Sequence, residues 1–143
     1  MHLGLRFFYL FINSWYCLSV ETEASVQLYL RLVQCNNDLG LKRVGVALAK
    51  YYVCQRAPNV TFEALQCFGG NGYVENYDMA RIYRQAPLNS IWEGSGTVCA
   101  LDVLRALKDE ETRSSLRDEL FSNKGSCARF DLFLANYIDP ILS

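Results

Sequence analysis

Apolar side chains recur at helical spacing through most of this 143-residue chain, and no segment shows a convincing strand-like alternation of apolar and polar residues. A helix with one apolar face buries that face against another element. Because short polar or glycine-containing segments separate the stripes, the sequence predicts an all-α fold, an antiparallel, up-and-down helix bundle. The stripes comprise Val26, Leu30 and Val33; Val44, Ala47, Leu48, Tyr51 and Cys54; Val98, Leu101, Leu104 and Leu107; and Phe130, Phe133, Leu134, Tyr137 and Ile138.

Capping residues suggest where the first of these helices begins and ends. Ser19 is a good N-cap, and Glu21 and Glu23 would then lie at the positive end of the helix dipole. The polar run from Asn36 to Gly40 is expected to end the helix.

A second helix is expected from about Leu41 to Phe68, with one weak point inside it. Pro58 lacks a backbone donor and clashes with the preceding turn, which predicts a kink near Ala57 or a short break. The glycine-rich segment at residues 69–73 is not expected to stay helical, and its glycines permit positive φ angles or a close backbone approach.

The second half of the chain reads as shorter helices. We expect a connection over residues 74–90 with a helical turn around Asp78 to Tyr83, and a third long helix from about Asn89. A polar turn at residues 108–111, a short helix at 111–121, a break at Gly125 and a last helix ending at Pro140 follow.

The first 17 residues differ from the rest. A charge-free run of 14 residues, Phe7 to Val20, is too short to span a bilayer. It is best read as a buried helix or strand, or as an atypical chain start. We therefore divide the chain into an atypical segment, residues 1–17, and a helical bundle, residues 18–143.

Charge and cysteine usage restrict the function. The net charge is −1, whereas a nucleic-acid-binding protein usually has a basic excess, so a nucleic-acid partner is not expected. The six cysteines show no C-x-x-C spacing and His2 is the single histidine, so no metal site is expected. Cys35, Cys54, Cys67 and Cys99 lie in apolar helical stretches, which predicts buried, reduced thiols and an intracellular location.

Glu93 is the most unusual charged residue of the chain. It lies between Trp92 and Gly94, with Gly96 close by, and each glycine lowers helix propensity by about 1 kcal/mol. Trp92 and Ile91 are positioned to desolvate the carboxylate partly, which favours a role as general base. A glutamate near a helix N-terminus, stabilised by the dipole, is an equally good interpretation of the local pattern.

The glycine segment at residues 69–72 also has two readings. It follows a predicted helix, unlike a Rossmann fingerprint, and it lacks the Lys-Ser/Thr of a Walker A loop. Taken alone it is a helix C-cap and turn, or a backbone surface on which a ligand can lie.

Two segments together resemble a known family. Residues 64–73 look like the glycine loop of the acyl-CoA dehydrogenase C-terminal domain. Residues 81–96 resemble the segment that carries the catalytic glutamate of that family, and the 27-residue spacing from Gln66 to Glu93 matches without a gap. The stretch from Asn89 through Leu107 is most similar to the branch named for the bacterial adaptive response to alkylation damage, and the resemblance covers about residues 18–143.

The resemblance implies a chemistry and a set of site residues. In the family a glutamate removes the α-proton of an acyl-CoA thioester while a hydride passes from the β-carbon to FAD, and Glu93 matches that catalytic position. Members form dimers or tetramers, so a homo-oligomer is expected. The resemblance also implies a mitochondrial or cytoplasmic location. The stretches that match FAD contacts are Gln66, Cys67, Phe68, Gly69 and Gly70, and Ser95, Gly96 and Thr97.

Two departures from the family pattern matter. Thr97 stands where family members usually carry Gln or Asn. The family also uses an N-terminal helical domain and a middle β-barrel, for which 143 residues leave no room, so we expect a fragment that is incomplete and inactive in isolation. The alternatives are a catalytically inactive oligomerisation module and a DNA-associated adaptive-response protein, although the charge of −1 argues against the latter.

Overall fold

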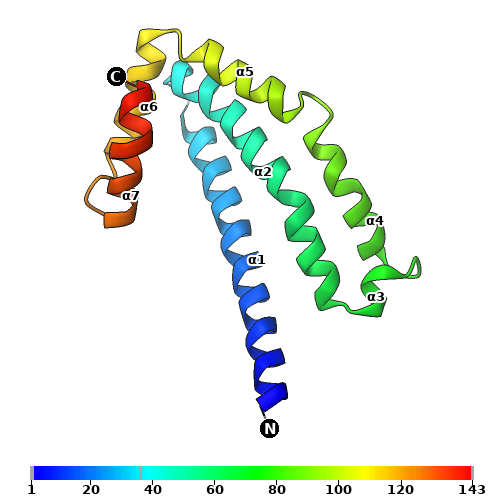
Figure 1. Cartoon of the computed structure of the whole chain (residues 1–143). Helices are drawn as coiled ribbons and strands as arrows, with labels where there is room; N and C mark the ends of the chain where they lie inside the picture. The colour runs from blue at the N-terminus through cyan, green and yellow to red at the C-terminus, as the bar shows by residue number, and fades with distance from the viewer. Residues whose placement is uncertain (1, 36, 143) are drawn as a thin grey trace.

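Helix α2 (Leu39–Cys67) is the element that most of the fold packs against. In the computed structural model, which describes residues 2–35 and 37–142 and side chains from residue 15 onward, α2 contacts α1 (His2–Gln34), η1 (Ala86–Ser90) and α5 (Gly96–Ala106). Figure 1 shows α1 and the α4–α5 segment on opposite sides of α2. The Asp38 carboxylate starts α2 because it accepts the N–H of Leu41 at 2.8 Å.

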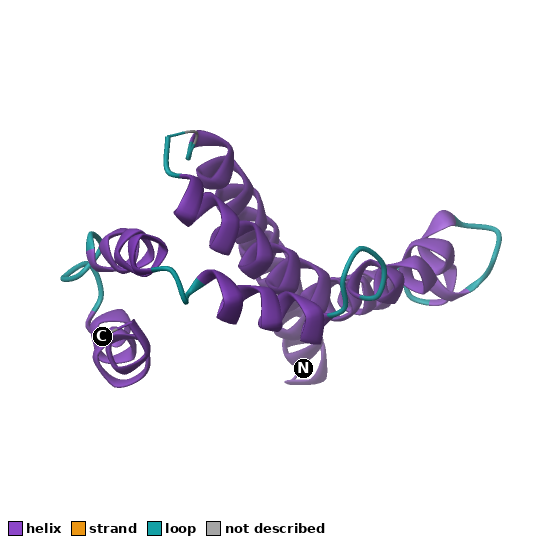
Figure 2. Ribbon diagram, turned by 90° about the horizontal axis from the view of Figure 1, so that it is seen from above, coloured by secondary structure: helices purple, strands orange, loops and turns teal. Residues whose placement is uncertain are grey.

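The chain reverses direction after α1 and again after α2 (Figure 1). After α2 come α3 (Gly70–Tyr73) and α4 (Asp78–Gln85), and η1 and α5 then run back along α2 (Figure 1). The C-terminal part consists of α6 (Glu110–Phe121), α7 (Ala128–Phe133), a π-helical turn η2 (Leu134–Ile138) and α8 (Asp139–Leu142). The described residues form only helices and loops (Figure 2), which confirms the predicted all-α, up-and-down bundle.

The core lies where α1 turns into α2. Val44 and Leu134 are the largest side chains that are almost fully buried. The connected cluster draws on α2, α5, α6 and α8, so the C-terminal helices close this end of the bundle. Its buried members are Cys35, Leu41, Val44, Ala106, Leu116 and Leu142.

The predicted start of the first helix at Ser19 is wrong. α1 runs from His2 to Gln34, and the Ser19 hydroxyl donates to the carbonyl of Trp15 at 3.0 Å within the helix. Glu21 therefore does not serve a helix N-terminus; it pairs with Arg56 of α2. The predicted boundary between residues 17 and 18 falls inside α1, and the division into two segments stays a prediction.

The end of α1 agrees better with the sequence. α1 stops at Gln34, and of the polar run only Asn36 lies outside the described residues. Gly40 belongs to the first turn of α2 rather than to the connection. Cys35 and Cys99 are buried as predicted, whereas Cys54 and Cys67 are half-buried.

Pro58 and the glycines behave differently from expectation. α2 continues through Pro58, so the alternative of a short break is wrong, and the Thr61 hydroxyl donates to the carbonyl of Ala57 beside it at 2.9 Å. The glycine-rich segment was expected to be non-helical, but Gly70–Tyr73 forms the single turn α3. The break lies at Gly69, whose φ is 55°.

The third long helix starts later than predicted. α5 begins at Gly96, and residues 91–94 form a turn rather than the first turns of a helix from Asn89. The chain does break at Gly125 (φ 92°), and the last helical region passes Pro140 by two residues, to Leu142. Helical residues run without a break from Ala128 to Leu142, and Pro140, whose missing N–H removes one hydrogen bond of this run, comes just after its π-helical turn η2.

Two surface ion pairs lie at α4, and a bidentate one joins helices that are distant in sequence. Arg81 pairs with Asp78, and Arg84 pairs with Glu75. Arg31 of α1 holds Glu119 of α6 with two hydrogen bonds of 2.6 Å. This hydrogen bonding by the guanidinium keeps the pKa of Glu119 below its usual range.

We expect a small pH-dependent loss of stability in Glu119→Gln. A carboxyl with a lowered folded pKa stabilises the fold above the pKa of the unfolded chain, and that contribution is lost as pH falls through the folded pKa. The variant should therefore be less stable than the parent at neutral pH and should lose less stability on acidification. Thermal melts across acid to neutral pH measure this. Glu111→Gln, an exposed position on the same helix, is the control; equal pH dependence in both variants would contradict the assignment.

None of the helices in the described part of the chain combines the length and the apolar character needed to cross a bilayer.

Candidate active site

Glu93 lies in a tight turn that leads into α5. It is the non-glycine residue with positive φ in the described chain, at 54°, and Gly94 follows with φ 112°. A glutamate in this region is uncommon and costs of the order of 1–3 kcal/mol in backbone strain. The turn follows η1, whose Leu88 carbonyl accepts the N–H groups of Ile91 at 2.9 Å and Trp92 at 3.2 Å. The surrounding structure therefore holds Glu93 in an unfavourable conformation.

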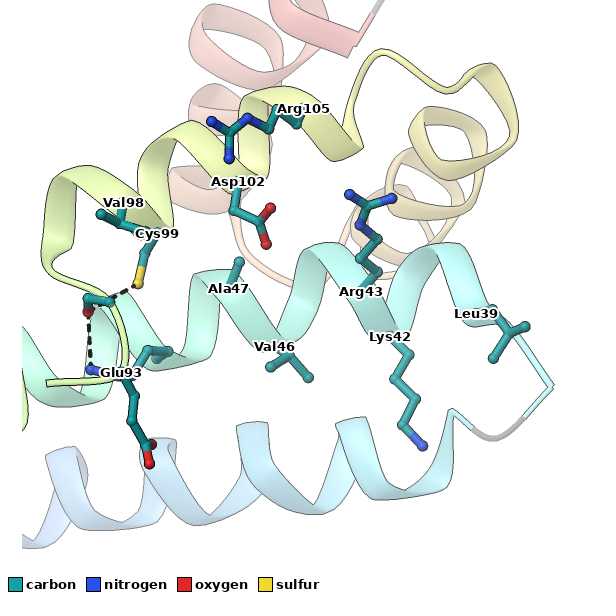
Figure 3. A pocket seen from close by; sticks show the side chains of 12 residues that line it. Leu39, Lys42, Arg43, Val46, Ala47, Glu93, Val98, Cys99, Asp102 and Arg105 are labelled. Atoms are coloured by element: carbon teal, nitrogen blue, oxygen red, sulfur yellow. Dashed lines mark hydrogen bonds between the residues drawn. The ribbon is translucent and has the colours of Figure 1, made fainter.

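A cleft of about 500 Å³ lies beside this turn, between α2 and α5. Figure 3 shows Arg43 and Asp102 pointing into the space between these helices, while the Glu93 side chain points away from α5, toward α1. Val46, Ala47 and Val98 supply apolar wall. The cleft thus combines a carboxylate at its edge with a partly apolar, partly cationic lining.

Lys50 of α2 holds the turn, although it was not among the site residues predicted from the sequence. The Lys50 ammonium donates to the carbonyl of Asn89 at 2.6 Å and to that of Gly94 at 3.3 Å. Gly94 O also accepts the Cys99 thiol, with a sulfur–oxygen distance of 3.7 Å. A charged residue three positions after Ala47, on an apolar face of a helix, is the one signal in the sequence that could have indicated this contact.

The predicted residues Ser95, Gly96 and Thr97 lie directly after the turn. Ser95 precedes α5 in an extended conformation, and its hydroxyl does not cap the helix. A Cβ on Gly96 would lie 2.8 Å from Nε2 of Gln55 and 3.2 Å from Cε2 of Tyr51. This close contact seats the start of α5 on α2, while Ser95 and Thr97 stay exposed.

The other predicted set, residues 66–70, lies at the far end of α2. Gln66 and Cys67 belong to its last turn, Phe68 and Gly69 form the exposed turn that follows, and the exposed Gly70 begins α3. Phe68 is 60% exposed. Gln66 is eleven residues beyond Gln55, about 16 Å along the helix axis. The structure therefore brings Glu93, Ser95, Gly96 and Thr97 together but keeps them apart from residues 66–70.

The expected desolvation of Glu93 is not present in this chain. Ile91 is 64% exposed and Trp92 55% exposed, and Glu93 itself is exposed. Both neighbours belong to the exposed turn at residues 91–94 and so leave the carboxylate in contact with solvent. The alternative interpretation, a glutamate near a helix N-terminus, agrees with the position of Glu93, which lies two residues before Ser95, the N-cap of α5, although outside the helix itself.

The chain combines an all-α bundle with a strained glutamate ahead of α5 and a glycine turn after α2. This combination is that of one class of helical domain. Residues 16–108 match the family described as "Acyl-CoA dehydrogenase, C-terminal domain". The chain belongs to this family of oxidoreductases and flavoproteins.

Curated relatives agree with the family assignment. The chain is 41% identical over 90 residues to the Escherichia coli protein named "Putative acyl-CoA dehydrogenase AidB", covering 62% of this chain and 17% of that protein. It is 36% identical over 107 residues to "Acyl-CoA dehydrogenase family member 11" of Caenorhabditis elegans, covering 66% and 17%.

A third relative is "Cyclohexane-1-carbonyl-CoA dehydrogenase" of Syntrophus aciditrophicus, 35% identical over 77 residues, covering 53% of this chain and 20% of that protein. The chain thus spans about a fifth or less of the length of these relatives. No solved structure matches it.

The two predicted cofactor-binding sets have chemistry that fits a flavin dinucleotide. Ser95 and Thr97 offer exposed hydroxyl groups at the N-terminus of α5, where the helix dipole favours phosphate. Gly69 and Gly70 leave open backbone, since a Cβ on either would meet nothing within 4 Å. Gln66 adds an exposed amide and Phe68 an exposed ring, groups suited to a ribityl chain and an aromatic ring system.

Among the residues that the structure describes, no group of three or more histidine, cysteine, aspartate or glutamate side chains could hold a metal ion.

Proposed function

We propose that this chain is the C-terminal part of an FAD-dependent acyl-CoA dehydrogenase, acting on the CH–CH group of acyl-CoA thioesters, with Glu93 as the catalytic base. The observation that carries the proposal is the conformation of Glu93. An exposed glutamate held at φ 54° beside a cleft is a costly arrangement, and such strain is concentrated at functional sites. Family membership gives this outlier a chemical meaning.

In the proposed reaction Glu93 accepts the α-proton of the thioester. The backbone of the turn is anchored at both ends to α2 and α5. The Glu93 carboxylate can therefore move only by rotation of its own side chain. FAD, when bound, supplies the acceptor for the β-hydride. The desolvation that a carboxylate base needs would then come from the bound thioester and from surfaces beyond this chain, since Ile91 and Trp92 do not provide it.

The cofactor contacts are proposed for the two sets separately. Ser95, Gly96 and Thr97 are expected to contact the FAD nearest to Glu93. The set formed by residues 66–70 lies about 16 Å further along α2. The resemblance to the family implies that this stretch contacts the FAD of a neighbouring subunit, and therefore a homo-oligomer, a dimer or a tetramer.

An apolar groove also supports a homo-oligomer. It has a volume of about 560 Å³ and lies between α1 and α2, where Tyr29 is 65%, Val33 49% and Val46 52% exposed. Exposed apolar patches of this kind mark association surfaces. We expect a second copy of the protein to cover it in the oligomer. A mitochondrial or cytoplasmic location is proposed from the relatives, one of which is named "Isobutyryl-CoA dehydrogenase, mitochondrial".

The full-length protein should therefore purify as a yellow dimer or tetramer with about one FAD per chain, and it should reduce an electron-accepting dye when given acyl-CoA. Sedimentation, flavin absorbance and a panel of acyl-CoA chain lengths measure the three properties. A clean oligomer with neither flavin nor turnover would instead support an inactive oligomerisation module. Tight, salt-sensitive binding to DNA without turnover would support the DNA-associated alternative.

A further inference from the structure

Lys50 is the charged side chain that links α2 to both ends of the Glu93 turn. We propose that Lys50 is a positioning residue, whose ammonium group fixes the orientation of the turn and so of the Glu93 carboxylate. The inference rests on the proposed function, because the importance of the orientation depends on Glu93 being the base. The contact itself is independent of that role.

The Lys50 ammonium holds the turn at two backbone carbonyls. Lys50 lies on α2 and reaches the carbonyl of Asn89, at the end of η1, and the carbonyl of Gly94, immediately after Glu93. Residues 90–93 lie between these two carbonyls and lead from the last residue of η1 to the strained Glu93. A single ammonium with three donors can hold two carbonyls at once.

The surroundings make these hydrogen bonds necessary. The Lys50 side chain is half-buried and lines both the cleft beside α5 and the apolar groove beside α1. A partly desolvated ammonium requires acceptors, and hydrogen bonds in which one group is charged are stronger than neutral ones. The two backbone carbonyls therefore satisfy the lysine at the same time as the lysine orders the turn.

The turn needs such a restraint because its conformation is unfavourable by itself. A φ of 54° at Glu93 is maintained only if contacts on both sides outweigh the strain. On the α5 side Gly94 O accepts the Cys99 thiol, which is a weak donor. Lys50 supplies the strong contact. Without it the carboxylate would sample other directions, and misplacement of a reacting group by about 1 Å can cost about 100-fold in rate.

The test compares Lys50→Met, Lys50→Arg and Lys108→Met in the flavin-loaded, full-length protein. Methionine keeps the apolar stem but donates no hydrogen bond, and arginine restores a cation with several donors. Lys108 is an exposed lysine just after α5, so its replacement by methionine is the control for the loss of one charge. Amide hydrogen exchange over residues 89–95, flavin content, KM and kcat are measured for each.

We expect Lys50→Met to exchange the amides of residues 89–95 about tenfold faster or more, and to lower kcat about 10- to 100-fold with little change in KM or flavin content. Lys50→Arg should recover part of kcat, and Lys108→Met should match the parent. Unchanged exchange in this segment, or kcat within about twofold of the parent, would overturn the inference. A uniform loss of protection through α2 and α5 would also overturn it, since Lys50 would then be a general structural residue.

Failure of the proposed function gives a different result. If Glu93 is not the base, replacing Glu93 itself leaves turnover unchanged, whereas the exchange measurement on Lys50→Met still decides whether the lysine orders the turn.

Discussion

Glu93→Gln should lower acyl-CoA turnover about 1,000-fold in the full-length protein, within the range that a general base contributes. Glutamine has nearly the shape of glutamate, but its amide cannot accept the α-proton. Glu93 is exposed and makes none of the contacts that hold the turn, which run through the backbone carbonyls of Asn89 and Gly94. Flavin content and thermal stability should therefore stay at the parent values while kcat falls.

Steady-state kinetics with a dye acceptor and exchange of the thioester α-proton with deuterated water both measure this loss. Glu111→Gln is the matched control, an exposed glutamate in the first turn of α6, and it should retain full turnover. If Glu93→Gln turns over at the rate of this control, Glu93 is not the catalytic base. Loss of flavin from the variant would point to a cofactor-binding role for the same carboxylate.

Gly72→Ala should be the most destabilising single-methyl change in the glycine segment. Gly72 is buried, and a Cβ there would lie 2.3 Å from the carbonyl oxygen and 3.1 Å from the carbonyl carbon of Leu65. These are backbone atoms of α2, which cannot rotate away as a side chain does. Overpacking of this kind costs about 1–3 kcal/mol, so the melting temperature should fall by several degrees.

Gly70→Ala is the control within the same helical turn. A Cβ at Gly70 meets nothing within 4 Å, so alanine should leave stability unchanged or raise it by up to about 1 kcal/mol through the lower entropy of the unfolded chain. Thermal melts of the two variants, made side by side, measure the difference. Equal stabilities would show that α3 is not packed against Leu65 as the structure places it.

The fold class could be predicted because the spacing of apolar residues is a direct consequence of helix geometry. In the stripe that includes Val44 and Ala47 these two residues are buried, whereas Leu48 and Tyr51 of the same stripe are exposed. Helix ends were less predictable. Ser19 has the chemistry of an N-cap, but its hydroxyl bonds equally well to the carbonyl four residues earlier inside a helix, and nothing local distinguishes the two.

The motif indicates which residue to propose for the site but not the conformation of that residue. The motif around Glu93 located the residue, while its positive φ depends on contacts with α2 that are distant in sequence. Lys50 was missed for the same reason, because its partners are backbone carbonyls at Asn89 and Gly94 and backbone atoms have no sequence signature. Contacts between a side chain and a remote backbone need the fold before they can be recognised.

The uninterrupted course of α2 past Pro58 has a consequence for how this domain can change in evolution. One continuous helix sets both the distance and the rotation between Lys50, which holds the turn of Glu93, and Gln66, which is proposed to contact the FAD of a neighbouring subunit. A single inserted residue between them would turn one end by about 100° relative to the other and lengthen the helix by about 1.5 Å. The number of residues between Lys50 and Gln66 is therefore fixed by the structure, and we expect insertions to accumulate in the connections around Gly125 instead.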